Sequence, residues 1–151
     1  MMERKNMKKI KVIIGSIILI SLSLMINSVN ATELTWEKSV QSAFLKAMTE
    51  KKKIVLFVGR DSCGNCKYMR TQVFESEKPS VKKLLLNHFI LWFSDVDKSK
   101  EWYRTARGLS EITLPLICII DPASGKLYED RTTGIQHSPD FYSRLLKYTK
   151  E

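Results

Sequence analysis

The stretch Ile54–Cys66, IVLFVGRDSCGNC, decides the fold of this chain. It starts with the continuous apolar run Ile54–Val58, which is typical of a strand buried on both faces of a parallel or mixed sheet. Gly59–Ser62 is a short loop, and apolar residues at helical spacing follow between Cys63 and Phe74. The two cysteines therefore lie at the start of a helix that follows a buried strand, a recognised arrangement for thiol–disulfide chemistry.

The rest of the chain alternates helical and strand patterns. A helix is predicted within Leu34–Lys53, and the apolar runs Phe89–Phe93 and Leu116–Ile120 predict two more central strands. The remaining expected elements are a helix from Pro79, a short helix over Ser99–Arg107, a strand near Lys126–Asp130 that forms a hairpin across Asp121–Gly125, and a last helix capped by Ser138–Asp140. This order predicts an α/β fold with a central mixed sheet of about four strands flanked by helices.

The N-terminus has the pattern of an export signal. Basic side chains come first, and Val12–Ile26 follows as an apolar stretch of 15 residues without a charge. Because Val29–Ala31 offers small residues to a signal peptidase, we expect a signal peptide over residues 1–31 and one domain over 32–151. The alternative is an uncleaved anchor, although a spanning helix needs about 20 residues. Either way the domain is expected to be periplasmic or secreted, where disulfides persist.

Composition narrows the classes of function. The length of 151 residues suits one domain, and five of the 25 basic side chains that produce the formal charge of +9 precede Val12. No cluster of arginines with interleaved aromatic residues indicates nucleic-acid binding. Three cysteines are too few for a disulfide scaffold, so one CxxC pair and a single further cysteine fit a redox site better.

The order of elements resembles the thioredoxin-like superfamily, because Cys63–Cys66 follows the first central strand and Leu114–Pro115 precedes the third. Within it, the chain is similar to the extracytoplasmic thiol–disulfide oxidoreductases of bacteria. The likeness covers about Leu34 to Lys150. Trp36 and the segment Thr71–His88 match a branch with a Trp-led N-terminal helix and a longer insert after the active-site helix.

This resemblance implies further site residues. Pro115 should follow a cis peptide bond and lie against the active-site sulfurs, so that the Leu114 backbone can pair with a substrate chain. Gly64 and Asn65, between the cysteines, complete the expected substrate-binding residues. Gly134 occupies the place of a family glycine after the last strand.

Two positions depart from the family pattern. Thioredoxins have a buried acidic residue six positions before the first cysteine, where this chain has Phe57. The proton of the second cysteine must then pass to water or to another group. Ser62 stands where an aromatic residue usually precedes the first cysteine, and Asp61, the nearest carboxylate in sequence, is expected to be exposed.

The two cysteines are expected to have different roles. Cys63, at the start of the helix, faces the positive end of the helix dipole, which favours its thiolate, and Lys67 adds a nearby positive charge. We therefore predict that Cys63 is the attacking nucleophile and Cys66 the resolving thiol. A purely structural disulfide is the alternative, but a loop of four residues removes little chain entropy.

Other roles for the cysteines fit less well. CxxC supplies two thiolates of the four ligands that a closed zinc site needs, and His88 and His137 are far apart in sequence, so no metal is expected. Covalent haem attachment needs a histidine where Lys67 stands. Cys118, inside an apolar strand, is expected to be a small core residue.

The sequence therefore predicts an extracytoplasmic thiol–disulfide oxidoreductase, a reductase or isomerase-supporting protein rather than an oxidase, that needs no cofactor. Its partners would be protein thiols and disulfides and a membrane electron donor or acceptor. The alternative is a non-catalytic binding module or holdase on the same fold, in which the disulfide between Cys63 and Cys66 is structural.

Overall fold

The computed structural model describes residues 33–99, 113–124 and 130–149. The chain divides into two units, Met1–Ala31 and Thr32–Glu151, and all described residues belong to the second. The expected signal peptide or anchor and nearly all of the helix expected over Ser99–Arg107 lie outside the described residues. Within the described ranges, no helix has the length and apolar character needed to cross a membrane.

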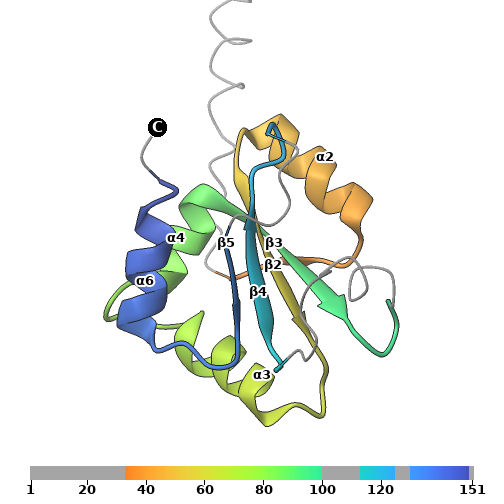
Figure 1. Ribbon diagram of the computed structural model, residues 1–151. Helices are drawn as coiled ribbons and strands as arrows, with labels where there is room; N and C mark the ends of the chain where they lie inside the picture. Colours follow the sequence, from red (N-terminus) through yellow and green to blue (C-terminus); the bar gives the residue numbers. More distant parts are fainter. Residues whose placement is uncertain (1–32, 100–112, 125–129, 150–151) are drawn as a thin grey trace, which may run out of the picture. The chain divides into compact units, whose positions relative to one another are not determined.

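A mixed sheet forms the centre of the domain, with strand order β1-β3-β2-β4-β5 (Figure 1). The strands are β1 (Trp36–Glu37), β2 (Lys53–Gly59), β3 (Phe89–Asp95), β4 (Leu116–Ile120) and β5 (Asp130–Thr133). β3 is parallel to both β1 and β2, whereas β4 is antiparallel to β2 and to β5. The predicted α/β class and mixed sheet are confirmed. The sheet has five strands rather than about four, because β1 adds a short edge strand.

Helices cover both faces of this sheet. They are α2 (Val40–Glu50), α3 (Gly64–Tyr68), the π-helical η1 (Met69–Val73), α4 (Val81–His88) and α6 (Ser138–Leu146). Figure 1 shows α2 on one side of the sheet and α4 and α6 on the other. Alternate residues of β2 supply two separate cores, since Val55 and Phe57 pack with the α3, η1, α4 and α6 side, and Leu56 packs with the α2 side. The prediction of a strand buried on both faces is confirmed.

The N-terminal part of the domain differs from the predicted helix. Trp36 lies in β1, where it pairs with Leu91, rather than at the start of a helix. The helix begins only at Val40, because the Ser39 hydroxyl accepts a hydrogen bond of 3.1 Å from the Ser42 backbone N–H and caps the first turn. The chain before the cap lies outside the helix, and Trp36 and Glu37 pair with β3.

The segment after the active-site helix also corrects the prediction. Pro79 does not start a helix, because the Val81 N–H donates to the Pro79 carbonyl over 2.8 Å and closes a turn there. Helix α4 begins at Val81. In η1, which precedes this turn, the hydrogen bonding is π-helical: the Phe74 N–H donates to the Met69 carbonyl, five residues earlier, over 2.9 Å.

The C-terminal hairpin and helix follow the predicted order with shifted boundaries. β5 pairs with β4 as expected but begins at Asp130, while residues 125–129 are outside the described part of the chain. Helix α6 begins at Ser138, with His137 rather than Ser138 at the cap position and Asp140 in the first turn. The expected core residues Phe141 and Leu145 of this helix are fully buried.

A buried ion pair fastens α6 to the sheet. Arg144 is only 7% exposed, and its guanidinium contacts the Asp130 carboxylate over 2.6 Å. The same side chain donates to the Ile117 carbonyl over 3.1 Å, and the Tyr148 hydroxyl donates to Asp130 over 2.6 Å. The pair therefore has the additional hydrogen bonds that a buried charge requires. No periodic pattern in the sequence indicates it.

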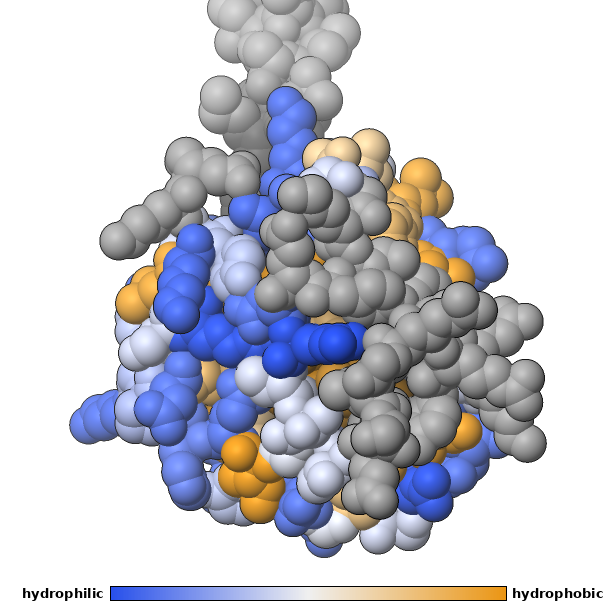
Figure 2. All heavy atoms as spheres, in the orientation of Figure 1, coloured by the Kyte–Doolittle hydropathy of each residue, from blue (hydrophilic) through white to orange (hydrophobic). Residues whose placement is uncertain are grey.

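Most of the described surface is polar. Four large apolar side chains remain exposed in the described residues, Leu45 and Met48 on α2, Tyr68 on α3, and Ile135 after β5. The face shown in Figure 2 is mostly hydrophilic, with small separate hydrophobic areas. Such scattered residues are normal on a soluble surface and do not by themselves mark a binding site.

Gly134 is expected to be required for stability. Its φ of +77° lies in the left-handed region, and its N–H donates to the carbonyl of Pro115 over 2.8 Å. Gly134→Ala should lower the free energy of unfolding by about 1–2 kcal/mol, because an L side chain disfavours that conformation. Urea denaturation measures this. Gly64→Ala, where a Cβ would meet nothing within 4 Å, is the control and should not lose stability.

Candidate active site

The two predicted cysteines lie at the junction between β2 and α3. β2 ends at Gly59, the chain crosses a short loop, and Cys63 occupies the N-cap position of α3. Cys63 and Cys66 form a disulfide, with their Cα atoms 5.2 Å apart. The loop is closed by a hydrogen bond of 3.3 Å from the Cys63 N–H to the Arg60 carbonyl. Strand burial on one side and helix capping on the other thus fix both cysteines.

The two sulfurs are not equivalent. Cys63 is partly exposed, and its Sγ accepts a hydrogen bond of 3.1 Å from the Cys66 backbone N–H. Cys66 is fully buried within the core that α3, η1, α4 and α6 form with the sheet. An incoming group can therefore approach Cys63 far more easily than Cys66. Gly64 and Asn65 are exposed beside Cys63, as a contact with substrate requires.

Gly59 makes room for the buried sulfur, a role that the sequence analysis missed. A Cβ at this position would lie 3.0 Å from Cys66 Sγ and 3.2 Å from the Phe57 ring. Both contacts are too close for ordinary packing, so a side chain here would displace Cys66. A glycine directly after a buried strand was the available signal, because such glycines often mark a close approach.

Phe57 fills the place where the family has a buried acid. It is fully buried, and its ring lies 5.8 Å from that of Trp36, 5.3 Å from that of Phe74 and 5.9 Å from that of Phe93, between centroids. The surroundings of Cys66 on this side are therefore aromatic. Asp61, as expected, has an exposed side chain, and it pairs with Arg70 over 3.4 Å.

Leu114 and Pro115 lie beside the same loop. The Leu114–Pro115 peptide bond is cis, Pro115 is buried and Leu114 is half-buried. In the antiparallel pairing of β2 and β4, Val58 stands opposite Leu116. The next position of the ladder brings Pro115 next to Gly59, at the start of the loop that carries the cysteines. Contact of Leu114 and Pro115 with a substrate stays a prediction.

Cys118 lies away from this site. It is 1% exposed, is not in a disulfide and packs in the core on the α2 side of the sheet, whereas Cys66 belongs to the other core. Burial raises the pKa of the Cys118 thiol to about 11, with the charges of Arg144 and Arg131 opposing the shift. The expectation of a core residue is confirmed. In the described parts of the chain, no group of three or more histidine, cysteine or acidic side chains is placed to hold a metal ion.

Comparison with known proteins agrees with this geometry. A family model described as thioredoxin-like matches residues 35–122. The chain belongs to the thioredoxin-like family. No curated protein gives a significant match.

Solved structures share the fold at low sequence identity. A thioredoxin from Thermus thermophilus superposes with a TM-score of 0.62 at 19% identity, covering 76% of this chain and 87% of that chain. A disulphide isomerase from Xylella fastidiosa Temecula1 has a TM-score of 0.58 at 18% identity, covering 80% and 100%. The C-terminal domain of Neisseria meningitidis DsbD, in its oxidised form, has a TM-score of 0.56 at 15% identity, covering 76% and 99%. At these identities the likeness establishes the fold.

Cys118 is expected to be unreactive in the folded protein. With a pKa of about 11, only about one thiol in a thousand is ionised at pH 8, and burial further blocks access. Mass spectrometry after brief iodoacetamide treatment of the reduced protein should find Cys63 alkylated and Cys118 unmodified until denaturant is added.

The raised pKa of Cys118 also predicts a pH dependence of stability. Because the pKa in the folded protein is raised from 9.0, the stability contributed by the protonated thiol should be lost as pH rises from about 9 to about 11. Cys118→Ala should lack this part of the pH dependence.

Proposed function

We propose that this protein is an extracytoplasmic thiol–disulfide oxidoreductase that exchanges disulfides with other proteins. The observation that carries the proposal is the asymmetric disulfide at the start of α3, in which Cys63 is partly exposed and Cys66 is fully buried. Exchange through a mixed disulfide requires an accessible nucleophile and a resolving thiol that outside groups cannot reach. Membership of the thioredoxin-like family supports this chemistry.

In the reducing direction the exchange has two steps. The Cys63 thiolate attacks one sulfur of a substrate disulfide, forming a mixed disulfide and releasing the other substrate sulfur as a thiolate. The Cys66 thiolate then attacks Cys63 Sγ, forming the Cys63–Cys66 disulfide and releasing the second substrate thiolate. Two electrons pass to the substrate, and its thiolates take up protons from solvent.

Local structure assists the first step. Cys63 is at the N-cap, where backbone N–H groups at the start of the helix have no intrahelical acceptor and stabilise a negative sulfur. The Cys66 N–H already donates to Cys63 Sγ over 3.1 Å. The same hydrogen bond would stabilise the Cys63 thiolate when the pair is reduced. Lys67, the residue directly after Cys66 in α3, is exposed and contributes positive charge at longer range.

The second step needs a route for the Cys66 proton. The aromatic ring of Phe57 cannot accept it, and Asp61 is exposed and paired with Arg70. We therefore propose that the Cys66 proton passes to water that enters the site while Cys63 is held in the mixed disulfide. Resolution would then be slower than attack.

The proposed location and direction rest on the sequence. The basic and apolar pattern of residues 1–31 favours export, and an exported reductant needs electrons from a membrane donor. We propose work as a reductase or in support of an isomerase, with protein thiols and disulfides as partners. An oxidase would instead pass its electrons to a membrane acceptor.

Cysteine variants test the proposed roles. Cys66→Ser should accumulate mixed disulfides at Cys63 with partner proteins, because the resolving thiol is missing, whereas Cys63→Ser should reduce exchange to the uncatalysed rate. Non-reducing gel electrophoresis and insulin reduction measure the two effects. Cys118→Ala is the control and should behave as the unmodified protein. A non-catalytic binding module would instead retain its partners in Cys63→Ser and form no adduct in Cys66→Ser.

The reduction potential of the Cys63–Cys66 pair tests the direction. Equilibration with glutathione or dithiothreitol buffers should give a value near or below about −230 mV, in the range of reductants. Tryptophan fluorescence or thiol alkylation reports the reduced fraction. A value near about −120 mV would instead make the protein a disulfide donor and contradict the proposed direction.

A further inference from the structure

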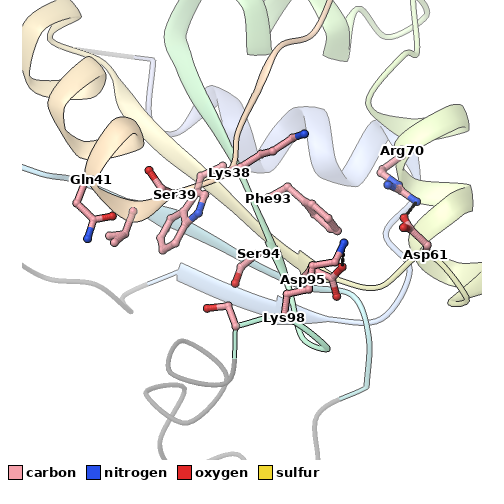
Figure 3. A pocket seen from close by; sticks show the side chains of 12 residues that line it. Lys38, Ser39, Gln41, Asp61, Arg70, Phe93, Ser94, Asp95 and Lys98 are labelled. Carbon is pink, nitrogen blue, oxygen red and sulfur yellow. Dashed lines mark hydrogen bonds and ion pairs between the residues drawn. The ribbon is translucent and has the colours of Figure 1, made fainter.

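A pocket of about 570 Å³ lies beside β3 (Figure 3). Its wall includes the start of α2, the C-terminal end of β3, and Asp61 and Arg70 from the active-site loop and helix. Asp61 is two residues before Cys63 in the chain. The pocket therefore adjoins the redox site without containing either cysteine.

The pocket opens where β3 becomes an edge strand. β1 is only two residues long and pairs with Leu91 and Trp92 alone. From Phe93 onward, β3 has no neighbour on that side among the strands of the described residues. Alternation along the strand places Ser94 on the same face as Trp92, which is the face that α2 covers.

Ser94 is the unusual residue of this pocket. Its side chain is 4% exposed, and among the described residues its hydroxyl has no hydrogen-bond partner. Figure 3 shows the Ser94 side chain among the residues that line the pocket, and Ser39 at the start of α2 lines the same pocket. Buried hydroxyl groups in proteins are nearly always paired, and an unpaired one costs free energy. A bound group that accepts a hydrogen bond from Ser94 would remove this cost.

The charges of the pocket favour an anion. Both carboxylates of its wall are already paired, Asp61 with Arg70 over 3.4 Å and Asp95 with Lys98 over 3.2 Å. Lys38 also lines the pocket and has no ion-pair partner among the described residues.

Helix α2 strengthens this preference for negative charge. It begins at the pocket, with Ser39 as its cap, and it has no acidic residue in its first turn. The Ser39 hydroxyl satisfies only the Ser42 N–H, so the N–H groups of Val40 and Gln41 at the helix start still lack an intrahelical acceptor. These groups and the helix dipole attract a negative group.

We propose that this pocket binds a carboxylate, which accepts a hydrogen bond from the Ser94 hydroxyl at the N-terminus of α2, with Lys38 nearby. Two sources can supply the carboxylate: an acidic side chain of a polypeptide held at Cys63, or a small free organic acid. The first source rests on the proposed function, because the acidic residue would flank the cysteine that Cys63 attacks. The second does not depend on redox activity.

Titration with sodium succinate tests the site without any redox reaction. The amide NMR signals of Val40 and Gln41 should shift and reach a plateau as succinate is added. Sodium chloride at equal ionic strength should cause no such saturable shift. Ser94→Ala should weaken succinate binding about tenfold, as expected for loss of a hydrogen bond to a charged group. Lys38→Gln should weaken it about twofold to fivefold, because an exposed charge contributes less. Lys83→Gln, an equal charge change on the exposed side of α4, is the control and should not alter binding.

Peptide substrates test the other source. A set of disulfide-linked peptides carries Glu or Gln at successive positions beside the cysteine, and kcat/KM is measured for each. At one position Glu should be preferred over Gln about tenfold in kcat/KM, and Ser94→Ala should abolish this preference, so that the variant treats the Glu and Gln peptides alike. The Gln peptides by themselves report whether exchange occurs, so failure of the proposed function is seen separately.

The two experiments together decide the proposal. Saturable succinate binding that Ser94→Ala weakens supports the site with a free acid as ligand, and the Glu preference supports it with a substrate side chain. Ser94→Ala should unfold at the same or a higher temperature than the unmodified protein, because it removes an unpaired buried hydroxyl. Weaker succinate binding by this variant would therefore not result from unfolding. Absence of both the succinate shift and the Glu preference would overturn the proposal.

Discussion

The burial of β2 on both of its faces is the constraint on which the rest of the domain depends. Its side chains alternate between two cores, so helices must cover both sides of the sheet. At the end of the strand, Gly59 allows the chain to turn with Cys66 Sγ close against the backbone. The cysteines thus follow directly after a strand that is buried from Ile54 to Gly59.

The same packing makes the two cysteines chemically different. Cys66 belongs to a core with the Phe57 ring against it, while Cys63 ends the loop and faces outward. A buried acid at position 57 would serve proton transfer but would have to lie among the rings of Trp36, Phe74 and Phe93. This chain instead has an aromatic side chain at this position of the core. The proposed transfer of the Cys66 proton to water follows from this difference.

The edge of β3 shows how a small shift in one element creates a surface. β1 ends at Glu37 and Ser39 caps α2, so among the described residues the end of β3 has no strand on the side opposite β2. The helix start, Ser94 and Lys38 then face one pocket next to the redox loop. None of these residues belongs to a motif. Their common surface arises from where the elements begin and end.

The sequence by itself determined the alternation of elements, the buried strand and the position of the CxxC pair, because hydrophobic periodicity and glycine or proline breaks are local signals. It did not determine that Trp36 forms a strand, that α4 starts after Pro79, or that Arg144 pairs with Asp130, because strand pairing, turn closure and buried ion pairs depend on residues far apart in the chain. The burial of Cys66, the closeness of Gly59 to its sulfur and the unpaired hydroxyl of Ser94 were likewise decided by the tertiary structure. Burial is a property of the packed domain, and no single segment carries it.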